Sequence, residues 1–261
     1  MTGVIPALVM STLAGLSTSI GGLIAVFARR TGTRMLSFAL GLSAGVMVTV
    51  SFVELLPEAR HSLSGALGAS AGGAAAAASL LGGFAVAMLI DRLIPDPSGA
   101  HGPSDASPRT QGQSLARMGL VTALAMTLHN FPEGIATFMA GYSNFRLGLP
   151  VTISISLHNI PEGIAVSMPI FYGTGSRKRA LGISTLSGLS EPLGALLAFL
   201  ILAPFLSSAL LGVIFGAVAG IMIYLSFQEL IPASEGYGHL ELALLGIAGG
   251  SAVMLAAIKL F

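Results

Sequence analysis

The chain has 261 residues, of which 54% are apolar and only 9% are charged, and its mean hydropathy is +0.87. Soluble domains carry about 25% charged residues, so this composition excludes an ordinary soluble protein and indicates an integral membrane protein. The formal net charge of +1 gives no reason to expect nucleic acid as a partner. The absence of cysteine excludes disulfides and thiolate metal ligands.

Apolar stretches recur along the chain at the length that crosses a bilayer, which is about 20 residues for roughly 30 Å of hydrocarbon. They predict an all-α polytopic membrane protein with eight transmembrane helices in a single domain over 1–261. The predicted helices cover residues 4–28, 36–57, 69–91, 118–142, 147–171, 180–203, 207–232 and 240–260. The first residues carry no basic side chain and the first stretch is long enough to span, so we expect it to stay uncleaved.

Lysine and arginine concentrate on one side of the predicted helices, and cytoplasmic loops hold these residues in excess. On the opposite side lie only Arg60, Arg146 and Lys259. The basic side carries Arg29, Arg30, Arg34, Arg92, Arg109, Arg117, Arg177, Lys178 and Arg179. We therefore expect this side to be cytoplasmic and both termini to be extracytoplasmic.

One long connection separates the third and fourth predicted helices. Residues 92–117 are rich in Pro, Gly, Ser and Asp and have almost nothing to bury, so we expect a disordered cytoplasmic loop. Its single histidine, His101, is expected to be a solvated side chain and not a ligand.

The chain resembles itself at two places. Residues 11–27 align without gaps to residues 184–200 with nine identities in 17, and residues 45–59 align to residues 220–234 with seven in 15. The first and second predicted helices thus reappear as the sixth and seventh, but with the opposite direction across the membrane. This predicts an inverted repeat in a 3+2+3 arrangement, with helices 1–3 related to helices 6–8. Such repeats are typical of secondary transporters, although a repeat could also record gene duplication alone.

The two central helices carry nearly identical polar motifs, LHNFPEGIA at 128–136 and LHNIPEGIA at 157–165. Residues four apart share a helix face, so His129 with Glu133, and His158 with Glu162, each present an imidazole and a carboxylate to the same side. Two ionised glutamates at mid-bilayer would cost on the order of 5–7 kcal/mol, so a cation or protons should compensate them. Imidazole, carboxylate and amide oxygens suit Zn²⁺, Fe²⁺, Mn²⁺, Co²⁺ or Cd²⁺. One intramembrane histidine alone would more simply make an interhelical hydrogen bond, and the two motif copies favour metal.

Proline and glycine accompany each glutamate. Pro132 and Pro161 remove a backbone donor, which hydrocarbon tolerates only where a cavity, a neighbour or an ion takes up the freed carbonyl. Gly134 and Gly163 would let the two helices approach closely enough for both glutamates to share a metal. The motifs therefore predict a kinked, metal-lined path.

Three further glutamates are candidates. Glu191 replaces Thr18 in the repeat alignment and adds an acid beside Pro192, with a metal-binding or a purely structural role. Glu54 and Glu229 occupy matched positions near the ends of the second and seventh helices, on opposite membrane faces. They are either pathway or gating residues or ordinary interfacial glutamates.

The paired His-Asn-x-Pro-Glu-Gly motifs, together with SGLSEPLGA at 187–195, resemble the ZIP family of divalent metal transporters, in its bacterial branch. The resemblance covers essentially the whole chain. It implies zinc uptake into the cytoplasm, often with iron, manganese, cobalt or cadmium, across the bacterial inner membrane. It also implies a binuclear site in which the two central glutamates bridge the metals. The implied ligands are His129, Glu133, His158 and Glu162 for one metal, and Asn130, Glu133, Asn159, Glu162 and Glu191 for the other.

The expected partners are the divalent metal ion as transported substrate, with no further cofactor, and the lipid bilayer. The chain could act alone or as a homodimer. The sequence leaves two other functions open. An intramembrane metalloenzyme is disfavoured because the motif lacks the His-Glu-x-x-His arrangement of two helix-borne ligands and a base. A passive channel of the same fold would differ in never saturating with metal concentration.

Overall fold

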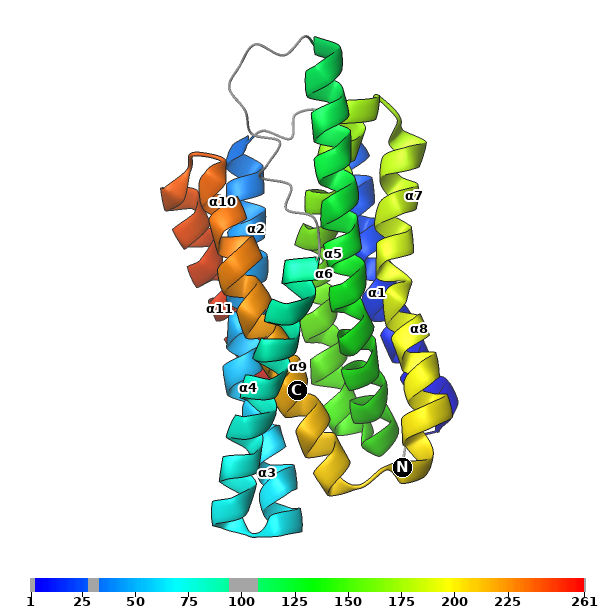
Figure 1. The fold of residues 1–261 in the computed structure, drawn as a ribbon, viewed down its shortest axis with the longest axis vertical. Coiled ribbons are helices and arrows are strands. Elements are labelled where there is room, and N and C mark those ends of the chain that lie inside the picture. The colour runs from blue at the N-terminus through cyan, green and yellow to red at the C-terminus, as the bar shows by residue number, and fades with distance from the viewer. Residues whose placement is uncertain (1–2, 28–32, 94–107, 261) are drawn as a thin grey trace.

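The computed structural model describes residues 3–27, 33–93 and 108–260 (Figure 1). Within these ranges the chain is helical, without a strand. The side chains of residues 93, 108–115, 118, 121, 125, 129 and 260 are also outside the description. The elements in chain order are α1 (Val4–Phe27), α2 (Thr33–Val50), η1 (Ser51–Leu55), α3 (Leu56–Leu67), α4 (Ala69–Leu93), α5 (Pro108–Ser143), α6 (Phe145–Thr174), α7 (Arg177–Gly188), α8 (Ser190–Leu197), η3 (Ala198–Leu202), η4 (Ala203–Phe205), α9 (Ser208–Leu225), η5 (Ser226–Leu230), α10 (Ile231–Gly236) and α11 (Leu240–Leu260).

Within the described ranges, six helical segments are long and apolar enough to cross a membrane. They are Val4–Phe27, Thr33–Leu67, Ala69–Arg92, Arg177–Phe205, Ser208–Gly236 and Leu240–Lys259. The two helices that carry the motifs, α5 and α6, are not among the six. Their motifs hold His, Asn and Glu, which are polar residues. The coarse prediction of a helical membrane protein is confirmed, whereas the eight-span arrangement stays a prediction.

The structure has helical residues at both ends of the loop predicted at 92–117. Helix α4 continues to Leu93, and α5 begins at Pro108, so residues 108–117 are helical. Proline is well tolerated in a first helical turn, where its missing N–H needs no partner. His101 and the remaining residues, 94–107, lie outside the described part of the chain.

Two helices are interrupted by π-helical turns at matched places in the repeat. Ser51–Leu55 and Ser226–Leu230 are the SFVEL and SFQEL segments, and each leads into a helix with proline in its first turn. In both turns the serine hydroxyl donates to the carbonyl four residues earlier, Ser51 to Met47 and Ser226 to Met222, at 2.7 Å. A π-helical turn adds a residue and is frequent at functional sites. The two sequence copies therefore share an unusual local backbone as well as residue identities.

The motif helices lie in the middle of the helix bundle. Helix α5 packs against α6 and α8, while α1 packs along α6 and also contacts α5 (Figure 1). On the other side of the molecule α2 packs against α11, α4 packs against α9, and α2 reaches α6. The site residues of α5 and α6 are consequently enclosed by other helices.

The outer surface is apolar, as expected of a membrane protein. Large apolar side chains point outward from the peripheral helices, including Ile5, Leu13, Leu81 and Leu245. A soluble monomer rarely exposes so many large apolar side chains. Together with the six apolar helical segments, this surface identifies an integral membrane protein.

Candidate metal centre

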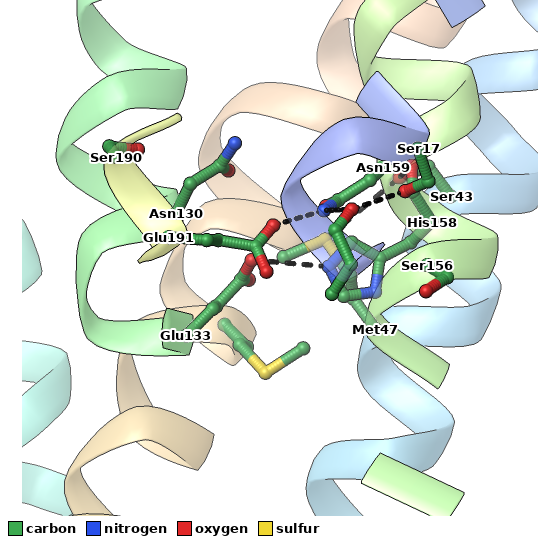
Figure 2. Close-up of polar contacts among 12 residues, drawn as sticks. Ser17, Ser43, Met47, Asn130, Glu133, Ser156, His158, Asn159, Ser190 and Glu191 are labelled. Carbon is green, nitrogen blue, oxygen red and sulfur yellow. Dashed lines mark hydrogen bonds and ion pairs between the residues drawn. The ribbon is translucent and has the colours of Figure 1, made fainter. Parts of the chain in front are cut away.

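Helices α5 and α6 bring one residue of each motif into contact. His158 Nε2 lies 3.3 Å from Glu133 Oε2, and both side chains are buried (Figure 2). The imidazole of the second motif therefore meets the carboxylate of the first. Glu162, four residues after His158 on α6, is also completely buried.

Helix α8 adds the third buried carboxylate. The chain turns at Leu189, between α7 and α8, where the Ser190 hydroxyl donates to the carbonyl of Ser187 at 2.7 Å. This break places Glu191 in the first turn of α8 with no exposed surface. Figure 2 shows Glu191 directed at Asn159 of α6, whose Nδ2 donates to Glu191 Oε1. The structure thus brings Glu191, predicted from the broken repeat symmetry, beside a motif residue.

The two motif asparagines donate hydrogen bonds to the backbone of neighbouring helices. Asn159 Nδ2 lies 3.0 Å from the carbonyl oxygen of Ala14 in α1, and Asn130 Nδ2 lies 3.4 Å from that of Ser187 in α7. In both cases the amide nitrogen faces a neighbouring helix. The amide oxygens of Asn130 and Asn159 are buried and have no hydrogen-bond donor among the described residues.

Glycine permits the close approach of these helices. A Cβ added at Gly134 would overlap the backbone oxygen of Glu191, and one added at Gly163 would overlap that of Thr18. A Cβ at Gly194 of α8 would overlap the carbonyl of Phe131 in α5. The glycines that follow the two motif glutamates are therefore at backbone contact with α8 and α1. The sequence prediction that they bring the two motif helices against each other was wrong, because each faces a different neighbouring helix.

Several oxygens of this cluster are buried without a partner. They are Oε1 of Glu133, both carboxylate oxygens of Glu162, and Oε2 of Glu191. The basic residues nearest to the motifs in sequence, Arg117 and Arg146, lie many residues away toward the helix ends. Buried carboxylate oxygens without donors are rare in folded proteins, because their desolvation is uncompensated. The cluster therefore has the chemistry of a cation site.

The described residues do not form a closed metal cage. Within that part of the chain, no group of three or more His, Cys, Asp and Glu side chains is placed to hold an ion. The predicted ligand His129 lies in α5, but its side chain is outside the description. Two of the three buried carboxylates make polar contacts within the protein, Glu133 with His158 and Glu191 with Asn159. A metal would have to displace or share these contacts.

Glu54 and Glu229 lie in the π-helical turns η1 and η5. Glu54 is near Glu58, and one of its oxygens is buried without a partner. Glu229 lies within electrostatic range of Glu162 and of Asp91. The structure thus relates Glu229 to the central carboxylate of Glu162, and Glu54 to Glu58.

Sequence reasoning missed two hydrogen bonds that connect neighbouring helices near the candidate residues. The Ser43 hydroxyl of α2 donates to the carbonyl of His158 at 3.4 Å, which connects the second helix to the motif (Figure 2). The Tyr224 hydroxyl of α9 donates to Asp91 Oδ2 of α4 at 2.7 Å, close to Glu229. Nothing in the sequence distinguishes Ser43 from other serines in apolar helices. Asp91 could have been noticed as an acid at the end of an apolar stretch.

Comparisons with known proteins agree with the resemblance found in the sequence. A sequence model of the family described as ZIP zinc transporter matches residues 96–257. The zinc transporter ZupT of Akkermansia muciniphila is 52% identical over 252 residues, which cover 94% of this chain and 93% of that protein. ZupT of Lysinibacillus sphaericus is 49% identical over 257 residues, covering 96% of each chain. ZupT of Streptococcus mutans is 45% identical over 256 residues, covering 98% of this chain and 97% of that one.

Proposed function

The chain belongs to the ZIP family of zinc transporters and transports zinc, and we propose that the metal passes through the buried cluster on α5, α6 and α8. The carrying observation is the set of buried carboxylate oxygens on Glu133, Glu162 and Glu191 that have no donor among the described residues. A passing dication would compensate these oxygens. Because members of this family are transporters, the metalloenzyme alternative is set aside.

The cluster is proposed to hold two metal ions. One would be bound by His129, Glu133, His158 and Glu162, and the second by Asn130, Glu133, Asn159, Glu162 and Glu191. The contact between His158 and Glu133 supports the first set, because it joins the two motifs. The contact between Asn159 and Glu191 supports the second. Glu133 and Glu162 would bridge both ions.

The ligand chemistry favours zinc and its neighbours. Nitrogen from imidazole and oxygen from carboxylate and amide suit Zn²⁺, Fe²⁺, Mn²⁺, Co²⁺ and Cd²⁺, whereas Cu⁺ prefers sulfur. We therefore propose Fe²⁺, Mn²⁺, Co²⁺ and Cd²⁺ as further substrates beside zinc.

The membrane arrangement is proposed to be the 3+2+3 inverted repeat, with α5 and α6 as the two central spans. The matched π-helical turns support the repeat, and the enclosure of α5 and α6 explains how polar helices are accommodated in a bilayer. The distribution of Lys and Arg supports extracytoplasmic termini, a cytoplasmic loop after α4, and import across the inner membrane. A homodimer stays a prediction from the sequence.

Zinc uptake into proteoliposomes tests the site. Glu133→Ala and Glu162→Ala should each abolish uptake in protein that is still inserted, because each removes a bridging carboxylate. Glu241→Ala, which changes an exposed glutamate at the start of α11, is the control and should transport normally. Zinc uptake that persists in Glu133→Ala would overturn the assignment. Competition by Fe²⁺, Mn²⁺, Co²⁺ and Cd²⁺ in the same assay tests the wider substrate range, and saturation with zinc concentration separates a carrier from a channel.

A further inference from the structure

Four hydroxyl groups of α1, α5 and α6 differ from their neighbours in having no hydrogen-bond partner within the described part of the chain. In the same helices, the hydroxyls of Thr12, Thr127 and Ser156 each donate to the carbonyl four residues earlier at 2.7 Å. This is the usual solution for Ser and Thr in a helix that offers no other partner. The hydroxyls of Ser11, Thr18, Thr137 and Ser154 are completely buried and have no hydrogen-bond partner among the described residues. Thr18 lies about one turn beyond Ala14 on α1, on the side away from Ser11, and so stands apart from the other three.

Ser11, Thr137 and Ser154 lie about one helical turn from the metal centre. Thr137 and Ser154 are on the motif helices α5 and α6, and Ser11 is on α1, which packs against both. Thr137 follows Glu133 by four residues on α5, and Ser154 precedes His158 by four residues on α6. Residues four apart share a helix face, so each hydroxyl lies one turn from a candidate ligand on the same face of its helix. Ser11 precedes by three residues Ala14, whose carbonyl accepts from Asn159. All three are displaced from the centre toward the turn that joins α5 to α6.

Helices α1, α5 and α6 approach each other closely on the side of these hydroxyls that faces away from the metal centre. A Cβ added at Gly148 of α6 would overlap the backbone of Gly141 in α5, and the thioether of Met10 in α1 covers both glycines. Thr137 lies between Glu133 and Gly141, and Ser154 lies between Gly148 and His158. The hydroxyls therefore occupy a layer between the carboxylates and the closed end of the three helices.

Buried hydroxyls without partners are destabilising, and proteins normally satisfy them with ordered water or a ligand. Here, unlike in Thr12, Thr127 and Ser156, the back-bond to the helix carbonyl is not made. Three such hydroxyls in one layer, beside buried carboxylates that also lack partners, therefore point to a shared ligand.

We propose that Ser11, Thr137 and Ser154 form a station for a partly hydrated divalent cation on the path between the carboxylate cluster and the α5–α6 turn. The inference rests on the proposed function of that cluster as the metal site. Neutral hydroxyls can replace the water molecules around the ion or hydrogen-bond to them. They bind the ion less tightly than carboxylates do, which suits a position that the ion must enter and leave. The layer would thus remove water from the metal in steps.

The test compares two triple variants in proteoliposomes, with zinc as the probe. The test variant is Ser11→Ala/Thr137→Val/Ser154→Ala, and the matched control is Thr12→Val/Thr127→Val/Ser156→Ala, which removes the back-bonded hydroxyls of the same three helices. Both variants are also measured for equilibrium zinc binding in detergent. The test variant should lose at least about tenfold in the maximal uptake rate, since three polar contacts to the ion or its water are gone. Its equilibrium zinc binding and the uptake of the control variant should stay within about twofold of wild type.

Thr137→Ser alone should restore most of the uptake that Thr137→Val loses, because it keeps the hydroxyl. Wild-type uptake in the test variant would overturn the proposal, as would an equal loss in the control. Loss of equilibrium zinc binding in the test variant would also overturn it, because the hydroxyls would then serve the folded core. Failure of the metal site itself would appear separately, as zinc uptake that persists in Glu133→Ala.

Discussion

His158 Nε2 lies 3.3 Å from Oε2 of Glu133, so the imidazole of the α6 motif contacts the carboxylate of the α5 motif. On its own helix, the carboxylate that shares its face is Glu162, whose two oxygens have no hydrogen-bond donor among the described residues. A side chain of one motif copy therefore contacts a side chain of the other across the interface between α5 and α6. Metal affinity should consequently depend on the spacing of α5 and α6 as well as on the ligands themselves.

Replacing His158 by Ala should weaken equilibrium zinc binding by at least about 100-fold. The change removes a proposed ligand and leaves Glu133 Oε2 without its partner, and the loss of even an outer hydrogen-bond partner of a ligand typically costs 10–100-fold. Equilibrium dialysis with zinc in detergent measures the effect. His61→Ala, at an exposed histidine of α3, is the control and should bind as wild type. Equal binding by the two variants would contradict the role of His158.

Asn159→Asp should lower the melting temperature of the metal-free protein and increase its stabilisation by zinc. The aspartate no longer donates to Glu191 or to the carbonyl of Ala14, and it places a second carboxylate beside Glu191. Like charges repel when no cation is present, whereas zinc gains a charged ligand and stabilises the folded state by binding. Thermal unfolding with and without zinc measures both effects.

The control for this change is Asn144→Asp at the N-cap of α6. Asn144 accepts from the backbone N–H of Arg146 at 2.9 Å, and aspartate serves equally well as an N-cap. Its melting temperature should match wild type with and without zinc. A metal-free melting temperature of Asn159→Asp equal to wild type would show that the contact with Glu191 contributes little.

Helix positions and the burial of the motif glutamates were largely predictable from the sequence. The first apolar stretch, predicted at 4–28, is α1 at Val4–Phe27, and the last, predicted at 240–260, is α11 at Leu240–Leu260. Apolar composition and terminal Gly, Pro and Ser residues carry this information locally. The buried positions of Glu133 and Glu162 followed from their place within apolar stretches, where an exposed charge would be costly.

The π-helical turns, the start of α5 and the partner of Asn159 could not be predicted from residue composition. A π-helical turn such as Ser51–Leu55 adds one residue per turn without altering the apolar character of the stretch. The helical start at Pro108 lies in a polar segment whose composition favours a loop. The partner of Asn159 is set by the tertiary approach of α8, and the repeat alignment identified Glu191 without indicating its neighbour.

Tyr224→Phe should destabilise the protein by about 1–3 kcal/mol, the usual cost of leaving a partly buried acceptor without its donor. The Tyr224 hydroxyl donates to Asp91 Oδ2 at 2.7 Å and so connects α9 to α4. The ring would keep its edge contact with Phe84, at 5.1 Å between centroids, so the loss is confined to the hydroxyl. Thermal unfolding in detergent measures the change.

A double-mutant cycle isolates the contact between Tyr224 and Asp91. Tyr224→Phe should cost little in a background that already carries Asp91→Ala, because the acceptor is gone. Fully additive losses would show that the two side chains do not depend on each other.

Gly134→Ala should reduce both zinc uptake and thermal stability. An added Cβ would overlap the backbone oxygen of Glu191, so α5 and α8 must separate and move Glu191 away from Asn159. In an open helix position the same change is neutral or stabilising, since alanine is favoured over glycine by about 1 kcal/mol. Gly182→Ala in α7, where nothing lies within 4 Å of the added Cβ, is therefore the matched control. Proteoliposome uptake and melting temperature should both fall in Gly134→Ala and stay at or above wild type in Gly182→Ala. Normal zinc uptake by Gly134→Ala would mean that the backbone contact between α5 and α8 is not needed to assemble the metal site.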